Sequence, residues 1–160
     1  MRHRSVSRAA AGFTLLELVV VIVILGIVAA FAAPRFFDDR TFLQRGYYDE
    51  LAAALRFAQK LAVASGCPVR VTIDATGYEA RQQAAQGGTC NTADATWGTA
   101  VALADGQVLA GNVPMGVTVA PAVTMTFDAL GRTDLGADQS IAVGPFALTV
   151  IADSGFVQAP

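Results

Sequence analysis

The stretch that decides the fold is "GFTLLELVVVIVILGIVAAFAAPRF", residues 12–36, which is apolar almost throughout. Only Thr14, Glu17 and Gly26 interrupt the apolar run before its end. At 1.5 Å per residue, about 20 such residues span roughly 30 Å, the thickness of a bilayer core. A soluble helix of this length, the alternative, would show a polar face, and this run shows none. The sequence therefore predicts a transmembrane helix over residues 13–35.

The residues before this run are basic and small. Residues 1–12 contain three Arg and no acidic residue. Because positively charged flanks stay in the cytoplasm, we expect a single-pass inner-membrane protein with a cytoplasmic N-terminus and a periplasmic C-terminal domain. A conventional secretory signal cut near Ala33 is the alternative, and it would remove the apolar helix. Cleavage after Gly12, the small residue at the end of the basic segment, would keep that helix.

Charge argues against nucleic acid as a default partner. The chain has 11 basic and 13 acidic residues, and without residues 1–12 the balance becomes 8 against 13. Phosphate binding needs clustered Lys and Arg, whereas Lys60 is the single lysine. We therefore expect no nucleic-acid binding.

The two cysteines, Cys67 and Cys90, both follow the apolar run. In an oxidising compartment two cysteines of one small domain usually pair, which here would close a loop of about 24 residues and contribute roughly 3 kcal/mol. Two free thiols are the alternative. Two cysteines without histidine cannot form a usual structural zinc site, so we expect no metal.

A second, amphipathic helical half is predicted after Pro34, where a continuing helix should kink because proline lacks the N–H donor. Within residues 42–66, apolar residues recur with helical spacing on one face: Tyr47, Leu51, Leu55, Ala58 and Ala62, with Tyr48, Ala54 and Leu61 beside them. Gly66 is a helix-stop signal. This half should therefore pack against the rest of the domain.

The remainder is typical of short strands separated by turns. "VRVTI" and "YEARQQ" flank the turn "DATG", which predicts a hairpin, and further strand-like runs are "TAVALA", "QVLA", "VTVA", "VTMTF", "SIAVG" and "FALTVIA". The predicted fold class is α+β, with a long N-terminal helix packed on antiparallel β-sheet. The predicted organisation is a leader (1–12), a membrane helix (13–35), an amphipathic helix half (36–66) and a β-rich domain (67–160).

No catalytic constellation is visible. The single histidine, His3, lies in the leader, which excludes Ser-His-Asp and Cys-His catalysis from the remaining chain. The neighbouring carboxylates at 38–39 and 49–50 diverge by about 100° on a helix and suit a solvated surface better than an acid–base pair. We expect neither an enzyme nor a cofactor. We also expect an aromatic cluster to pack under the domain rather than bind a ligand: Phe36, Phe37, Phe42, Tyr47 and Tyr48.

Residues 12–36 resemble the class III signal of type IV pilins and type II secretion pseudopilins: a basic leader ending in Gly, then Phe-Thr-Leu-x-Glu and an apolar helix. The resemblance implies that a prepilin peptidase cleaves between Gly12 and Phe13 and methylates the new amine of Phe13. It implies that Glu17 pairs with the first amine of an adjacent subunit. A Glu that merely reaches water at the membrane boundary is the alternative. Gly26 and Pro34 match positions where such helices bend.

A weaker resemblance narrows the subtype. "RGYYDELAAALRFAQKLAVASGCPVRVTID", residues 45–74, is similar to the helix and first strand of GspH/FimT-type minor pilins, and residues 125–132 and 148–157 are similar to strand and Gly-turn pieces of that domain. The combined pattern is most similar to MshC-type pilins of the MSHA pilus. Residues 129–130 depart from the pattern, because Ala and Leu stand where Pro or Asp is frequent before the Gly.

This resemblance implies a structural minor pilin of a type IV pilus (MSHA-like) or a type II secretion pseudopilus. Its partners would be other pilin subunits, the prepilin peptidase, the inner-membrane assembly platform and the membrane itself. The alternatives are a DNA-uptake or adhesion minor pilin, or a conventional membrane-anchored periplasmic domain.

Overall fold

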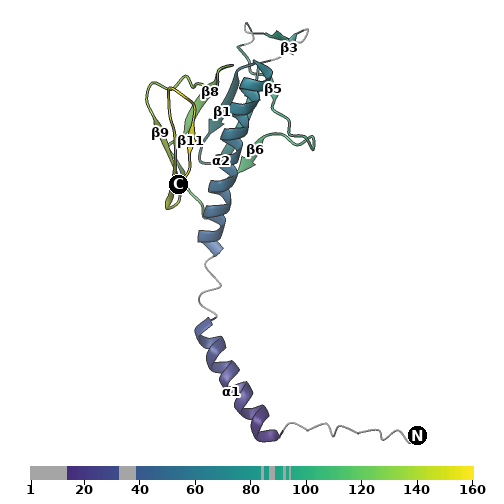
Figure 1. The fold of residues 1–160 in the computed structure, drawn as a ribbon, viewed down its shortest axis with the longest axis vertical. Coiled ribbons are helices and arrows are strands. Elements are labelled where there is room, and N and C mark those ends of the chain that lie inside the picture. The colour runs from purple at the N-terminus through teal and green to yellow at the C-terminus, as the bar shows by residue number, and fades with distance from the viewer. Residues whose placement is uncertain (1–13, 33–38, 84, 87–88, 92, 94) are drawn as a thin grey trace, which may run out of the picture. The chain divides into compact units, whose positions relative to one another are not determined.

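A computed structural model describes residues 14–32, 39–83, 85–86, 89–91, 93 and 95–160 (Figure 1). The chain divides into two compact units, residues 1–39 and residues 40–160. Several predicted features lie outside the described residues: the leader, the bond between Gly12 and Phe13, Pro34, Phe36 and Phe37. They therefore remain predictions.

The first unit contains one described element, the helix α1 (Leu15–Ala32). Among the helices that the structure describes, none is long and apolar enough to cross a membrane. The predicted span, residues 13–35, begins before α1 and ends after it.

The second unit consists of the helix α2 (Asp39–Ser65), whose first residue falls in the other unit, and short antiparallel strands. A five-stranded sheet has the order β5-β2-β1-β8, with β6 also paired to β2, and a four-stranded sheet has the order β11-β10-β9-β7. A two-stranded ribbon, β3-β4, stands apart. The strands are β1 (Val69–Ile73), β2 (Gly77–Gln82), β3 (Ala85–Gln86), β4 (Thr89–Cys90), β5 (Thr99–Ala100), β6 (Ala110–Asn112), β7 (Val119–Ala120), β8 (Val123–Phe127), β9 (Gln139–Val143), β10 (Phe146–Val150) and β11 (Val157–Gln158).

The predicted hairpin is confirmed. Val69 pairs with Gln82 and Ile73 with Tyr78 across β1 and β2. At the turn, Asp74 Oδ1 accepts hydrogen bonds from the backbone N–H groups of Thr76 (2.6 Å) and Gly77 (3.1 Å). Such an aspartate-capped turn stabilises the chain reversal between two strands.

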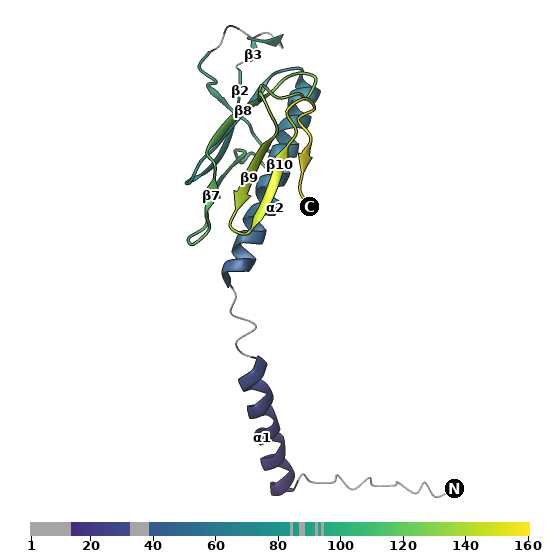
Figure 2. The same cartoon turned by 90° about the vertical axis from the view of Figure 1, so that its left-hand side faces the viewer.

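The packing of α2 on the sheets is also confirmed. The apolar positions Tyr47, Leu51, Leu55, Ala58 and Ala62 are each at most 2% exposed and form one core with the inward side chains of both sheets. Figure 2 shows β9 and β10 running beside α2. Gly66 ends the helix with φ +66°, a left-handed conformation that glycine adopts without strain.

One part of the aromatic prediction is wrong. Tyr47 and Tyr48 are buried, but Phe42 is 80% exposed. At about 100° per residue, Tyr47 lies about 140° around the helix from Phe42. When the tyrosines face the core, Phe42 must therefore face away from it.

Two glycine turns from distant parts of the sequence meet on α2. Gln59 Nε2 donates to the carbonyl oxygens of Gly131 and Ser154, each at 3.0 Å. Gly131 and Gly155 have positive φ, and a Cβ on Gly155 would collide with the backbone carbonyl of Gly131. Glycine is therefore required at position 155 by both conformation and space.

Candidate functional site

The most unusual surface of the first unit is α1 itself. Every large apolar side chain from Leu15 to Val28 is exposed, with exposed fractions from 40% to 81%. A helix that is apolar on all sides is stable only when other apolar groups surround it, either lipid or protein. Within its own unit, α1 therefore presents an apolar surface that requires a partner.

Glu17 is the one charged residue of α1 and lies in its first turn, where the helix dipole favours a negative charge. The backbone N–H of Glu17 donates to Thr14 Oγ1 (3.2 Å), and the N–H of Leu18 donates to the carbonyl oxygen of Thr14 (3.2 Å). Thr14 is thus the N-cap of α1.

The role of Thr14 was not predicted from the sequence, although a signal for it exists. Thr14 and Glu17 form the pattern Thr-x-x-Glu directly before an apolar run, which is the signature of a capping box. In such a box the Glu can also support the helix start. The sequence pattern therefore gives Glu17 a second candidate function, at the helix start, besides the predicted pairing with another subunit.

The other predicted assembly residue that the structure describes is Gly26. It lies inside α1, which stays helical through it, and the position of its missing Cβ has no neighbour within 4 Å. A bend at Gly26 on assembly stays a prediction.

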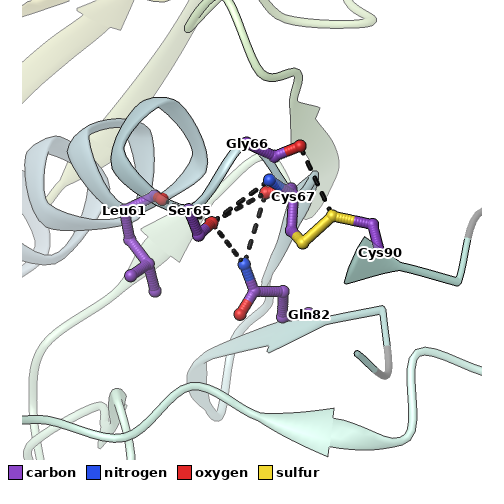
Figure 3. The surroundings of a disulfide bond; sticks show 6 residues. All are labelled: Leu61, Ser65, Gly66, Cys67, Gln82 and Cys90. Atoms are coloured by element: carbon purple, nitrogen blue, oxygen red, sulfur yellow. Dashed lines mark hydrogen bonds between the residues drawn. A yellow bond between two sulfur atoms is a disulfide. The ribbon is translucent and has the colours of Figure 1, made fainter. Parts of the chain in front are cut away.

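The predicted disulfide between Cys67 and Cys90 is confirmed, with 5.4 Å between the Cα atoms (Figure 3). Ser65 Oγ donates to the carbonyl oxygen of Leu61 (2.7 Å) and accepts from the backbone N–H of Cys67 (3.2 Å). Gln82 Nε2 donates to Ser65 Oγ (2.8 Å) and to the carbonyl oxygen of Cys67 (3.3 Å). The disulfide therefore fastens the segment around β4 to the end of α2 and the start of β1.

A second contact holds the same segment further along the chain. The guanidinium of Arg70 on β1 lies 4.0 Å from the ring centroid of Trp97, a cation–π geometry. Trp97 is 8% exposed and has φ +52°, which is uncommon for a bulky residue. Besides the disulfide, this contact therefore also holds the segment that carries Cys90.

A tyrosine pair joins α2 to β2, with Tyr47 on the helix and Tyr78 on the strand. Tyr78 Oη donates to Glu50 Oε1 at 2.8 Å, and the rings of Tyr47 and Tyr78 are 6.2 Å apart. Burial, and then the charge of Glu50, raise the pKa of Tyr47 to about 12. Burial is also the main cause of the raised pKa of Tyr78, followed by its hydrogen bond to Glu50. Both hydroxyls are therefore neutral at physiological pH.

The described residues contain no group of three or more His, Cys, Asp and Glu side chains that could hold a metal ion. Asp49 and Glu50 are exposed, as the sequence predicted for that acidic pair. Asp49 pairs with Arg45 (3.2 Å), and Glu50 accepts from Tyr78. These carboxylates have structural contacts and no arrangement typical of acid–base catalysis.

Two protein families match this chain. Residues 7–33 match the prokaryotic N-terminal methylation motif, and residues 48–157 match type II transport protein GspH. Among curated proteins, the type IV narrow pilus major component PilA5 of Thermus thermophilus is 48% identical over 61 residues. That match covers 37% of this chain and 53% of PilA5, so the chain spans about half the length of this relative.

A solved structure shares the fold. The type IV minor pilin FimU of Pseudomonas aeruginosa PAO1 aligns with a TM-score of 0.51 and 16% identity, over 78% of this chain and 92% of FimU. A second crystal form of FimU aligns with a TM-score of 0.49 and 14% identity, over 72% of this chain and 91% of that chain. The predicted combination of an N-terminal helix with antiparallel sheets is the pilin fold. With an N-terminal methylation motif, the pilin fold and a match to GspH over residues 48–157, the chain belongs to the GspH family of type II transport proteins.

Proposed function

We propose that the chain is a structural minor pilin that assembles, through α1, into an MSHA-like type IV pilus or a type II secretion pseudopilus. The observation that carries this proposal is the exposure of apolar side chains on all sides of α1, with Glu17 as the only charge. Packing among equivalent helices of neighbouring pilin subunits would remove this surface from water. Before assembly the subunit would be held in the inner membrane, with its domain in the periplasm, and the assembly platform would extract it.

Processing precedes assembly in this proposal. The prepilin peptidase cuts between Gly12 and Phe13 and methylates the amine of Phe13. The match of residues 7–33 to the N-terminal methylation motif supports this step. Cleavage there leaves α1 on the mature subunit, whereas a cut near Ala33 would remove it. Intact mass and N-terminal sequencing of the protein from native membranes test the step: a chain that begins with N-methylated Phe13 is expected, and a chain that begins after Ala33 would refute it.

Glu17 has two possible tasks, and they differ in what they require. Pairing with the amine of a neighbouring subunit requires the negative charge. Support of the helix start requires only a hydrogen-bonding side chain, because Gln serves in a capping box as well as Glu does. An unpaired carboxylate among apolar helices costs on the order of a few kcal/mol, so a charge pair would penalise a wrong stagger between subunits. We propose that the charge pair is the task that assembly needs.

The test replaces Glu17 by Gln and, separately, Thr14 by Ala. Glu17→Gln keeps a side chain suited to the capping box but removes the charge, and we expect incorporation into sheared filaments to fall at least about tenfold. Thr14→Ala keeps the charge and removes the cap, which costs about 1 kcal/mol, so its incorporation should fall by no more than about fivefold. Membrane levels of each variant, measured on the same cells, are the control.

If incorporation into filaments falls more for Thr14→Ala than for Glu17→Gln, Glu17 acts in the helix cap and not in a charge pair. Glu17→Leu removes both the charge and the hydrogen bonds and should be at least as defective as Glu17→Gln. Normal incorporation of Glu17→Leu would refute both tasks.

A further inference from the structure

Four turns with almost no charge lie together at one end of the second unit, and we call this end the neutral end. The strand pairings place them there: residues 74–76, 113–118, 121–122 and 144–145. Asp74 is the only charged side chain among these four turns. At the opposite end of the sheets, the connections 128–138 and 152–156 carry five charged side chains. The two ends of the domain therefore differ in kind.

The helix α2 begins at the neutral end. A Cβ on Gly144 would meet the side chain of Gln44, in the second turn of α2, and Figure 2 shows the turn between β9 and β10 at the same end as the start of the helix. Phe42 and Leu43 are 80% and 40% exposed. The start of α2 therefore adds two exposed apolar side chains to the neutral turns.

Met115 lies at the tip of the turn that follows β6 and is 95% exposed. The turn is closed by its own hydrogen bond, from the N–H of Val117 to the carbonyl oxygen of Pro114 (3.0 Å), and Gly116 has φ +84°. A methionine side chain is apolar and flexible, so it adapts to irregular apolar surroundings. The turn thus presents an apolar side chain to whatever lies beyond the neutral end.

Backbone groups at the neutral end are suited to a medium poorer in water. The N–H of Val113 donates to the carbonyl oxygen of Thr76 (2.8 Å), and the N–H of Gly144 donates to that of Thr118 (2.9 Å). Three turn residues have no N–H because they are prolines: Pro114, Pro121 and Pro145. Both features lower the cost of removing these turns from water, since fewer donors lose a partner.

The sequence keeps the neutral end close to α1. Only residues 33–38 separate the two helices, and a chain of this length spans at most about 25 Å. A subunit that is held in a membrane by α1 therefore keeps the start of α2 near the lipid.

We propose that the neutral end rests on the lipid surface of the membrane that holds the same subunit, with Met115 and Phe42 inserted at the boundary between headgroups and acyl chains. This inference rests on the proposed function, because α1 must first anchor the chain. Burial of apolar side chains is the driving force, as in helices that lie in a membrane interface. Charge contributes little, because Arg40 at the start of α2 is offset by Asp74 in the turns.

Tryptophan quenching in lipid vesicles tests this contact. The full-length protein carries Trp97→Phe, which removes the single native tryptophan, together with either Met115→Trp or the control Leu130→Trp. Leu130 is also an exposed turn residue (73%), but it lies at the opposite end of the domain. The vesicles contain phosphatidylethanolamine and phosphatidylglycerol, with part of the lipid brominated near the top of its acyl chains. We expect bromine to reduce the fluorescence of Met115→Trp and to leave that of Leu130→Trp unchanged.

The position of Met115 makes this test informative. Phe42 is close to α1 in the sequence, so a tryptophan there would be quenched by the tether alone, whereas Met115 reaches lipid only when the neutral end does. Absence of quenching at Met115, or equal quenching at Leu130, in protein that floats with the vesicles would overturn this inference and leave the proposed function intact. Protein that does not float with the vesicles would overturn the proposed function, and this inference with it.

Salt separates apolar contact from attraction to anionic lipid. Quenching at Met115 should persist in high salt and in vesicles without phosphatidylglycerol, because screening weakens only the interactions between charges. Loss of quenching under either condition would overturn the apolar contact and show electrostatic binding instead.

Two further variants keep the test independent of a single substitution. With Ala122→Trp as the reporter, on another turn of the neutral end, Met115→Asp should restore most of the fluorescence lost to bromine, because a charged side chain opposes insertion. Undiminished quenching of that reporter would overturn the role of Met115. A spin label on Met115→Cys leaves Trp97 in place, and Cys67 and Cys90 do not react because they are joined. Its collision rate with oxygen should exceed that with a water-soluble nickel chelate, and the reverse order would overturn the contact.

Discussion

Reduction of the bond between Cys67 and Cys90 should destabilise the domain by a predictable amount. The two residues are 23 positions apart, and in the chain-entropy model a cross-link over this separation contributes about 3.4 kcal/mol at 25 °C. The unit it belongs to, residues 40–160, has about 120 residues and hence an unfolding entropy of roughly 250 cal/mol/K. Reduction should therefore lower Tm by roughly 13 °C.

Thermal unfolding of the detergent-solubilised protein, with and without reductant, measures this shift by circular dichroism. Trp97 is the single tryptophan and lies in the segment that Cys90 fastens, so its fluorescence reports on that segment separately. The double variant Cys67→Ala/Cys90→Ala is the control, because reductant should not change its Tm. Equal Tm values for the oxidised and reduced wild type would refute the entropic argument. Two alkylatable thiols in the native protein would refute the disulfide itself.

Three further predictions concern the stability of the domain, and denaturant unfolding checks each of them. Leu55 is fully buried against both sheets, so Leu55→Ala should cost about 2–5 kcal/mol; a loss below about 1 kcal/mol would contradict the packing described. Gly155→Ala should cost clearly more than the control Gly106→Ala, because both have positive φ but only a Cβ at 155 meets the carbonyl of Gly131; equal costs would disprove that close approach. Among the described residues the buried hydroxyl of Tyr47 has no hydrogen-bond partner, so Tyr47→Phe should raise the free energy of unfolding by about 1 kcal/mol. Because burial raises the pKa of Tyr47 from 10.0 to about 12, its neutral form is favoured on folding, and its contribution is complete below pH 10 and lost as pH rises to about 12. The wild type should therefore lose more stability than Tyr47→Phe between pH 9 and pH 12.

The sequence predicted best where one periodic pattern determines burial. Helical spacing identified the face of α2 that includes Leu51 and Leu55, and both are fully buried. Alternation and the turn "DATG" identified β1 and β2, because strand period and turn chemistry are local properties. The same local reasoning failed for Phe42. Its aromatic side chain suggested a core residue, but its angular position on the helix turns it outward.

Strand pairing between distant segments was beyond local patterns. "TAVALA" and "QVLA" contribute only the short strands β5 and β6, and β11 was not predicted. Their pairing depends on contacts to β2 and β10 from elsewhere in the chain. Of the candidate site, the cysteine pair followed from composition. The N-cap Thr14 was not predicted, because Glu17 was interpreted only as a contact with another subunit and not as the acidic residue of a capping box that begins three residues earlier.

The polar contacts of α2 determine how this domain can fold. Tyr48, Arg56 and Gln59 bind backbone carbonyl oxygens of Pro160, Val157 and Ser154, across sequence separations of 112, 101 and 95 residues. Contacts between residues so far apart in the sequence form slowly, because a long loop must close before they are made. During synthesis the helix is made first, and the core around its apolar inner face stays incomplete until β9, β10 and β11 are made. The rate at which nascent chains escape aggregation should therefore be set by the last strands to appear rather than by the helix that organises them.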